Sequence, residues 1–277
     1  MQRLLTALIA TPLALAALFK LPSPWFLAFV ALFIEVAVWE YLAIVRSRAP
    51  RAPLSVLLLL VPLSAVALSI SMIERTGSFI AEQHLMAAAV LLAVGIGSLV
   101  LLSRTPLEEA IPALGILCFG VPYFAAPIAA LQHLQRADPW LVFLLMAIVW
   151  LGDTGAYYVG RRLGRHKMAP VVSPNKTWEG AAAGFVVSLI SAVVWSLCRL
   201  DRLDPGLLGV AALTAAAAQV GDLMESLIKR SAGVKDSGHV LPGHGGVLDR
   251  MDAMLFAAPV MLLGFWLLRI DGLAVPR

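Results

Sequence analysis

The sequence predicts an all-α, polytopic integral membrane protein, a helical bundle of about nine transmembrane helices. Of its 277 residues, 60% are hydrophobic and only 14% are charged, which is far more apolar than a soluble domain. The apolar residues gather in runs near the roughly 20 residues that a helix needs to cross a bilayer. No soluble domain of useful size fits between these runs, so the chain is expected to form a single integral membrane unit.

Nine apolar runs are candidates for membrane-spanning helices. They cover residues 4–19, 25–45, 53–72, 85–102, 110–131, 139–160, 178–198, 206–228 and 251–269. The first and fourth are short, so eight or ten spans also agree with the sequence. The first run resembles a cleaved signal sequence, but we expect a retained helix because many spans follow. We divide the chain into N-terminal transmembrane helices, 1–138, and a C-terminal transmembrane region with polar loops, 139–277, within a single integral membrane unit.

The distribution of cations predicts the orientation in the membrane. With nine spans, 14 of the 21 Lys and Arg residues lie on the side that holds the amino terminus, and 7 lie on the other. Because cytoplasmic loops carry an excess of Lys and Arg, we expect the amino terminus and the polar loops that follow the sixth and eighth runs to face the cytoplasm. The net charge of +4 is thereby explained without a nucleic-acid partner. Cys118 and Cys198 lie in apolar runs and indicate no disulfide framework.

The second apolar run contains two acids, Glu35 and Glu40. Acids inside a membrane span are functional candidates by default. Five residues apart, these two do not share a helix face closely, and Glu40 lies near the basic cytoplasmic end. We therefore favour a structural role, with the carboxylate paired with an arginine or a backbone group.

A third acid, Asp153, lies within the otherwise apolar run 139–160. A buried carboxylate must be neutralised, paired or bound to a metal, because its desolvation costs several kcal/mol. The residues alone leave two alternatives open. Asp153 forms an ion pair with Arg161 or Arg162, or it binds a metal.

Residues 173–180, SPNKTWEG, combine a turn, a helix start and a lysine. Pro174 is expected to end any preceding helix, Thr177 to cap the next one, and Glu179 to complement its dipole. A helix amino terminus with free N–H groups and a neighbouring Lys176 is a natural phosphate site. Glycines four apart at 180 and 184 predict close helix packing.

The eighth run places charges at the membrane boundary. At about 1.5 Å per residue from Gly206, Asp222 lies roughly 24 Å along the helix, against an apolar core of about 30 Å. Lys229 and Arg230 then project beyond the cytoplasmic boundary. Glu225 and Lys229 have the spacing of a favourable ion pair. Asp222 lies deeper and lacks a local cation, so we expect it to bind a metal.

The most polar stretch is residues 226–252, SLIKRSAGVKDSGHVLPGHGGVLDRMD. Pro242 and the glycines at 243, 245 and 246 exclude regular helix or strand, and glycine leaves backbone N–H groups able to turn toward an anion. Asp249 and Asp252 share one face of the helix that follows. Hard oxygen ligands beside lysines and a glycine turn suit a magnesium–phosphate complex. A hydrated loop that only sets topology is the alternative, but topology needs only the cations.

This stretch resembles the signature of the phosphatidate cytidylyltransferases, also called CDP-diacylglycerol synthases. The matching positions are Ser226, Lys229, Arg230, Lys235, Asp236, Gly238, Leu241, Pro242, His244, Gly245, Gly246, Asp249, Arg250 and Asp252. The resemblance extends upstream to about Asp153 through the runs DTGAYYVG and SPNKTWEG. Residues 1–140 resemble the family mainly in hydropathy.

The resemblance implies transfer of a cytidylyl group from CTP to phosphatidic acid, giving CDP-diacylglycerol and pyrophosphate for phospholipid biosynthesis. It implies Mg²⁺ as the cofactor, with the possibility of a second cation. The expected partners are CTP, phosphatidic acid and the lipid bilayer, and a homodimer is left open. The residues predicted to carry out catalysis are Asp222, Lys229, Arg230, Lys235, Asp249 and Asp252. The metal ligands are expected to be Asp222 and Asp249, supported by Asp252 and Asp153. Further substrate contacts are expected from Ser173, Asn175, Lys176, Thr177, His244, Gly245, Gly246 and Arg250.

Other activities suit parts of the same pattern. A CTP-dependent lipid kinase or a CDP-archaeol synthase has a similar membrane architecture but does not account for the full signature. A CDP-alcohol phosphotransferase is weaker, because its longer aspartate motif is absent. Among non-enzymes, an anion transporter would also use intramembrane acids and broken helices.

Overall fold

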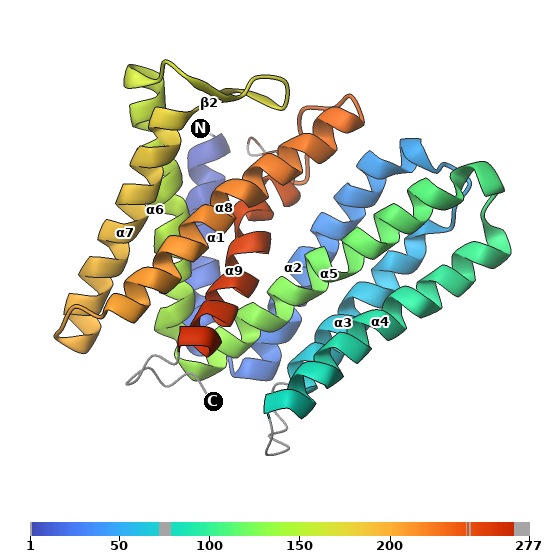
Figure 1. The fold of residues 1–277 in the computed structure, drawn as a ribbon, viewed down its shortest axis with the longest axis horizontal. Helices are drawn as coiled ribbons and strands as arrows, with labels where there is room; N and C mark the ends of the chain where they lie inside the picture. Colours follow the sequence, from blue (N-terminus) through green and yellow to red (C-terminus); the bar gives the residue numbers. More distant parts are fainter. Residues whose placement is uncertain (1, 72–78, 242, 244, 269–277) are drawn as a thin grey trace. The chain divides into compact units, whose positions relative to one another are not determined.

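The computed structural model describes residues 2–71, 79–241, 243 and 245–268, and within them the fold is helical (Figure 1). The helices are α1 (Gln2–Lys20), α2 (Ser23–Val45), α3 (Leu57–Ser71), α4 (Phe79–Arg104), α5 (Leu107–Ala137), α6 (Pro139–Leu163), α7 (Trp178–Leu200), α8 (Pro205–Ser231) and α9 (Leu248–Leu268). Short 3-10 turns, Arg46–Arg48 and Leu54–Val56, precede α3. A hairpin of β1 (Lys167–Ala169) and β2 (Ser173–Thr177) joins α6 to α7.

Each apolar run of the sequence coincides with one of these helices, so the prediction of an all-α membrane protein is confirmed. Within the described residues, 6 helices are long and apolar enough to cross a membrane: α2 with the turn that follows it, α5, α6, α7, α8 and α9. Shorter apolar helices cover Ala10–Lys20, Leu54–Ile70 and Val90–Arg104. The chain is therefore a multi-pass membrane protein, and the total of about nine spans stays a prediction.

The chain divides into two compact units. The first comprises residues 1–133 and 231–251, and the second comprises residues 134–230 and 252–277. The segment between α8 and α9, residues 232–247, which we call the motif loop, therefore belongs with helices from the amino-terminal half of the chain. The division at residue 138 that the sequence suggests stays a prediction.

In the first unit, aromatic packing fixes α2 against α5. Tyr41 is 2% exposed and meets the ring of Phe124 edge to face, with centroids 5.3 Å apart. The Tyr41 hydroxyl also donates to the backbone oxygen of Ile116, 3.4 Å away. Because buried aromatic pairs are large and directional, this contact sets the rotation of α2 about its axis. It thereby determines where the preceding residue, Glu40, points.

In the second unit, α6 and α7 pack closely through small residues. A Cβ at Gly184 would lie 2.7 Å from the backbone oxygen of Gly152, and the hydroxyl of Ser188 donates to Ile148 O at 2.7 Å. The prediction of close packing at Gly184 is confirmed. Side chains four apart on the opposite face of α7, Val186, Ile190 and Val194, are about half exposed, at 53–54%. Such a row of exposed apolar side chains suits a helix face that contacts lipid.

Helix α8 is attached to both of its neighbours in this unit. The amide of Gln219 donates to Ala181 O on α7 at 2.9 Å. On the other side, a Cβ at Gly221 would lie 2.7 Å from Asp252 O on α9, so only glycine permits this approach. The contact brings the start of α9 beside the turn of α8 that carries Asp222.

The predicted turn at residues 173–176 is wrong, because the segment is the extended strand β2. Its register pairs Lys167 with Thr177 and Ala169 with Ser173. A proline is disfavoured in a helix interior but tolerated in a short edge strand, so Pro174 agrees with either a turn or a strand. The cap prediction is confirmed: the Thr177 side chain accepts from Gly180 N, 3.2 Å away.

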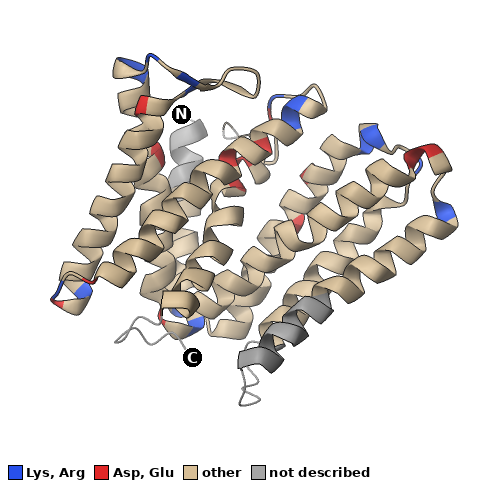
Figure 2. Ribbon diagram, viewed as in Figure 1, with Lys and Arg blue, Asp and Glu red and all other residues tan. Residues whose placement is uncertain are grey.

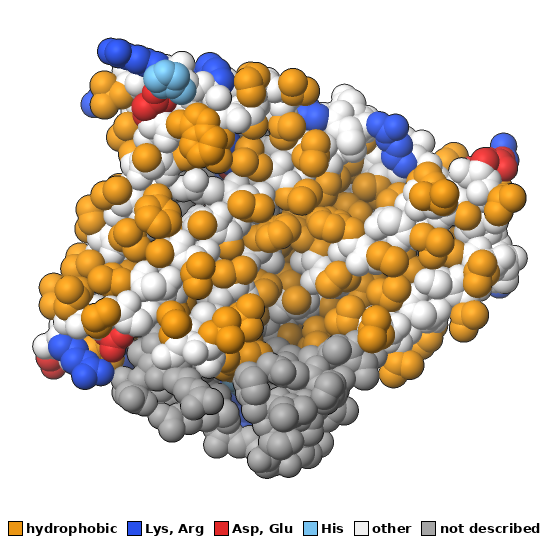
Figure 3. All heavy atoms as spheres, viewed as in Figure 1, with side chains coloured by type: hydrophobic (Ala, Val, Ile, Leu, Met, Phe, Trp, Pro, Cys, Tyr) orange, Lys and Arg blue, Asp and Glu red, His pale blue; other side chains and the backbone are white. Residues whose placement is uncertain are grey.

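Glu179 has a second role beside its position in the first turn of α7. Its carboxylate accepts from the backbone N–H groups of Arg165 and His166 at 3.1 and 3.2 Å and contacts His166 Nδ1 at 2.6 Å. It thus closes the base of the hairpin. Figure 2 shows Lys and Arg at the hairpin end of the α6–α7 pair, and Figure 3 shows hydrophobic side chains along α7.

Candidate active site

Three carboxylates from three helices of the second unit lie near enough for their charges to influence one another: Asp153 on α6, Asp222 on α8 and Asp252 on α9. Asp222 interacts electrostatically with both of the others, and Asp153 with Asp252. Asp153 is exposed, and Asp222 and Asp252 are partly exposed, so a ligand can reach them. The close approach of Gly221 to α9 explains why Asp222 and Asp252 come together.

Lys176 on β2 is an ion-pair partner of this cluster. Its Nζ lies 2.6 Å from Asp222 Oδ2, with side-chain exposures of 26% and 31%. Its charge also acts on Asp153. The expectation that Asp222 lacks a local cation is therefore wrong, because the cation comes from the hairpin and not from the helix of Asp222 itself.

The structure tests the alternative in which Asp153 forms an ion pair with Arg161 or Arg162. Among the described residues, no salt bridge joins Asp153 to Arg161 or Arg162; Arg161 donates to the hydroxyl of Tyr157 at 2.8 Å. The cation whose charge reaches Asp153 is Lys176. Metal binding by Asp153 stays a prediction.

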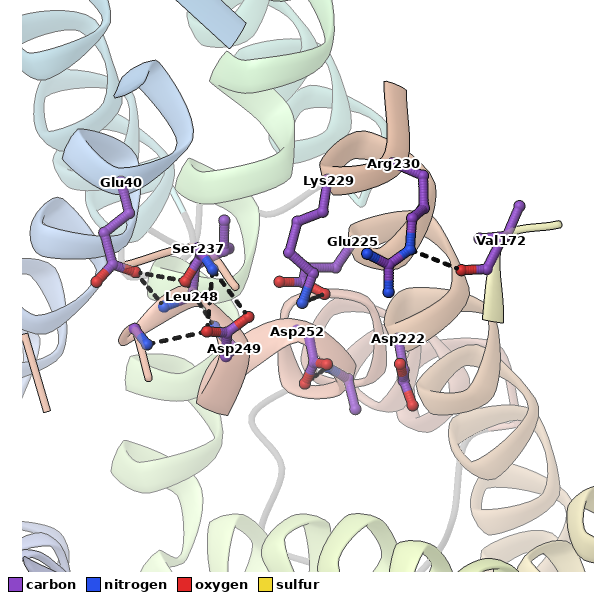
Figure 4. Close-up of polar contacts among 12 residues, drawn as sticks. Glu40, Val172, Asp222, Glu225, Lys229, Arg230, Ser237, Leu248, Asp249 and Asp252 are labelled. Carbon is purple, nitrogen blue, oxygen red and sulfur yellow. Dashed lines mark hydrogen bonds and ion pairs between the residues drawn. The ribbon is translucent and has the colours of Figure 1, made fainter. Parts of the chain in front are cut away.

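The predicted pair of Glu225 and Lys229 is confirmed. Lys229 Nζ lies 2.6 Å from Glu225 Oε2, and the side chains are only 11% and 1% exposed (Figure 4). The lysine also acts electrostatically on Asp252. Next to it, Arg230 Nε donates to Val172 O of the hairpin at 3.3 Å, which ties the end of α8 to the same hairpin that carries Lys176.

The donor set suits a hard divalent cation. Mg²⁺ prefers carboxylate oxygens, and the cluster offers three carboxylates. In the described part of the chain, no group of three His, Cys, Asp or Glu side chains is arranged to hold a metal ion as it stands. Lys176 neutralises Asp222 in this arrangement. The residues therefore fit Mg²⁺ by chemistry, provided that Lys176 moves away from Asp222.

In the first unit, Asp249 organises the motif loop. Its carboxylate accepts from Ser237 N at 3.1–3.2 Å and from Gly246 N at 2.9 Å. Gly243 and Gly245 have φ of 76° and 79°, and Leu241 N donates to Gly245 O at 3.0 Å. The predicted glycine turn is confirmed, and at least one of its N–H groups, that of Gly246, is taken up within the protein.

Glu40 is the residue whose importance the sequence did not reveal. It is fully buried, at 0% exposure, and accepts from the hydroxyl of Ser237 at 2.9 Å and from the N–H groups of Val247 and Leu248 at 3.0 and 2.8 Å (Figure 4). The predicted structural pairing with backbone groups is confirmed. In the sequence Glu40 stands out as an acid inside an apolar run, but this does not identify the distant segment that it binds.

The predicted site residues fall into two groups, one in each unit. The first unit holds Lys235, Gly245, Gly246, Asp249 and Arg250; the second holds Asp153, Ser173, Asn175, Lys176, Thr177, Asp222, Lys229, Arg230 and Asp252. His244 lies outside the described residues. Thr177 is buried as a helix cap, whereas Asn175, Lys235 and Arg250 are exposed. Their assignment to one substrate site, and of Asp222 and Asp249 to one metal cluster, stays a prediction.

Comparison with known proteins covers nearly the whole chain. Residues 1–268 match the model of the cytidylyltransferase family. A phosphatidate cytidylyltransferase of Haemophilus influenzae is 30% identical over 278 residues, 93% of this chain and 96% of the relative. One of Bacillus subtilis is 34% identical over 263 residues, 94% and 95% of the two chains. One of Staphylococcus haemolyticus is 47% identical over 132 residues, 47% of this chain and 50% of the relative.

The family match begins at residue 1. The match therefore includes residues 1–140, for which the sequence alone shows a resemblance mainly in hydropathy. The helices that surround Glu40 are part of the matched region. On the family match and on two relatives at 30–34% identity over most of both chains, this chain belongs to the cytidylyltransferase family.

Proposed function

We propose that the protein transfers the cytidylyl group of CTP to phosphatidic acid, releasing pyrophosphate and forming CDP-diacylglycerol at the cytoplasmic face of a bacterial inner membrane. Membership of the cytidylyltransferase family and the names of the relatives support the reaction. The observation that carries it is the cluster of three carboxylates flanked by Lys176 and Lys229. Such a cluster suits a polyphosphate that arrives with a divalent cation.

In the proposed reaction, an oxygen of the lipid phosphate attacks the α-phosphorus of CTP. A new P–O bond forms as the bond between the α-phosphorus and the oxygen bridging to the β-phosphorus breaks, and pyrophosphate leaves with that electron pair. The second pKa of a phosphate monoester is near 6, so the nucleophile is mostly deprotonated at neutral pH. No strong general base is required of the protein.

The residues of the site then act by binding and by neutralising charge. Lys176 exchanges its contact with Asp222 for a contact with a phosphate oxygen, which leaves the Asp222 carboxylate free to act as a ligand. Lys229, held by Glu225, keeps a positive charge beside Asp252. These two cations offset the repulsion between two anionic substrates and stabilise the charge that develops on the leaving pyrophosphate.

Asp222, Asp252 and Asp153 of the second unit would hold Mg²⁺, while the role of Asp249 as a principal ligand stays the expectation drawn from the sequence. When bound, the ion neutralises the triphosphate and stabilises the leaving group. A second cation and a homodimer are compatible with this proposal and are not needed by it.

The test is incubation of the purified protein with CTP labelled in both the cytidine and the γ-phosphate, phosphatidic acid and Mg²⁺. The expected products are a cytidine-labelled lipid and labelled pyrophosphate in equal amounts, formed only when phosphatidic acid is present. Phosphate transfer to a lipid with release of CDP would instead identify a lipid kinase. Intact CTP in detergent, together with its movement across proteoliposomes, would identify a transporter.

A further inference from the structure

We propose that Glu40 is a positioning residue for this reaction: from helix α2 it holds the motif loop and the first residues of α9 in the conformation in which Asp249 faces its ligand. The proposal rests on the proposed function for its catalytic consequence. Its structural part, the hold of Glu40 on the loop, is independent of any substrate.

The carboxylate of Glu40 takes three hydrogen bonds from two points of the loop. Oε1 accepts from Val247 N at 3.0 Å, and Oε2 accepts from Leu248 N at 2.8 Å and from Ser237 Oγ at 2.9 Å. Val247 and Leu248 stand at the amino terminus of α9, where N–H groups have no partner within the helix. Glu40 thus caps α9 from another helix, and its negative charge complements the dipole.

Ser237 connects Glu40 to Asp249. The Ser237 hydroxyl donates to Glu40 and accepts from Asp249 N at 3.3 Å, and Ser237 N donates to the Asp249 carboxylate at 3.1–3.2 Å. The carboxylate of Asp249 is therefore oriented by a residue whose own position depends on Glu40. Residues that hydrogen-bond to a metal ligand and so orient it commonly have large effects on activity when they are mutated.

Two glycines of the motif loop are explained by the space that this carboxylate occupies. A Cβ at Gly246 would lie 2.4 Å from Glu40 Oε2 and 2.0 Å from Ser237 Oγ, and a Cβ at Gly238 would lie 2.6 Å from Glu40 Oε1. Because a side chain at position 238 or 246 would collide with Glu40, both positions require glycine. The two glycines need no phosphate to account for them.

Glutamine cannot replace this acid. Both oxygens of Glu40 accept from backbone N–H groups that have fixed directions, and an amide offers only one oxygen. In Glu40→Gln, one N–H at the start of α9 faces an NH₂ group and loses its acceptor. A matched control is Glu35→Gln, the same chemical change on the same helix, at a carboxylate whose oxygens have no hydrogen-bond partner among the described residues.

The test combines amide hydrogen exchange, followed by mass spectrometry, with steady-state kinetics on the full-length protein in detergent. In Glu40→Gln, exchange of peptides covering 237–249 should accelerate about 10–100-fold, as expected for loss of a hydrogen bond to a charged group. Peptides of α6 and α7 should not change. The kcat per folded molecule should fall about 10–100-fold with an unchanged KM for CTP. Glu35→Gln should match the wild type in both measurements.

Ser237→Ala removes one hydroxyl and no charge, so it serves as the second variant if Glu40→Gln does not fold; it should show the same pattern. If amide hydrogen exchange of the motif loop is unchanged in Glu40→Gln, the proposal that Glu40 fixes the loop is wrong. If exchange in the loop becomes faster but kcat is unchanged, Glu40 is not a positioning residue. The same holds if a smaller folded fraction accounts for the whole loss of activity. If the wild type forms no CDP-lipid, the proposed function fails, while the exchange data still decide whether Glu40 fixes the loop.

Discussion

Lys176 on β2 and Asp222 on α8 form an ion pair of 2.6 Å between Nζ and Oδ2. The pair joins a short hairpin to a membrane-spanning helix beside two further carboxylates, Asp153 and Asp252. With side-chain exposures of 26% and 31%, both partners are partly exposed. The pair is the part of the site that substrate and metal would first have to rearrange.

Replacing Lys176 tests whether it binds phosphate. Lys176→Met should lower kcat/KM for CTP about 100–1,000-fold, the usual loss on removing one donor that stabilises transition-state charge. Lys167→Met, at an exposed lysine of the paired strand β1, is the matched control and should keep near-wild-type activity. The measurement is initial-rate formation of CDP-lipid over a range of CTP concentrations. Equal effects of both substitutions would remove Lys176 from the substrate site.

The Asp222 carboxylate is expected to be a metal ligand. Asp222→Asn should abolish Mg²⁺-dependent turnover, because an amide oxygen carries no charge to hold the ion. Asp201→Asn, at the opposite end of α7 from Thr177, makes the same change at an exposed position and should be silent. Activity is followed in a magnesium titration, with thermal unfolding as a check on folding. Retained turnover in Asp222→Asn at ordinary magnesium concentrations would exclude this residue as a ligand.

The buried pair of Glu225 and Lys229 predicts a stability effect separate from activity. Glu225→Gln removes the carboxylate that pairs with the buried Lys229 ammonium, which should lower the free energy of unfolding by about 3 kcal/mol. Glu225→Gln combined with Lys229→Met removes both charges and should recover most of that loss, although turnover stays low. Chemical denaturation in detergent measures the first effect and the CDP-lipid assay the second. A double variant no more stable than Glu225→Gln would contradict the pairing.

Close packing of α6 on α7 depends on Gly184. In Gly184→Ala the new methyl group would lie 2.7 Å from Gly152 O and 2.9 Å from Ala156 Cβ, so the helices must separate. The expected cost is about 1–3 kcal/mol, typical of overpacking. Gly115→Ala, where nothing lies within 4 Å of the added atom, should be neutral or stabilising by up to about 1 kcal/mol. Thermal unfolding of the two variants in the same detergent compares them directly.

Features that depend on neighbouring residues were predictable from the sequence. Each apolar run became a helix because a chain in lipid must satisfy its own backbone hydrogen bonds. The cap at Thr177 and the ion pair of Glu225 with Lys229 followed from spacings of three and four residues on a helix. The glycine turn before α9 followed from the freedom of glycine to adopt positive φ.

Features that depend on partners far apart in the chain were decided only by the tertiary structure. Lys176 reaches Asp222 because residues 173–177 pair with β1 as a strand, a long-range choice that Pro174 alone did not specify. Glu40 binds a loop about 200 positions further on, at separations of 197, 207 and 208 residues, and no local pattern encodes that distance. The sequence by itself determined which segments are helical and which residue types carry the chemistry. Tertiary packing decided which of those charges meet, because ion pairs and hydrogen bonds form between whichever groups the folded helices bring within about 3 Å.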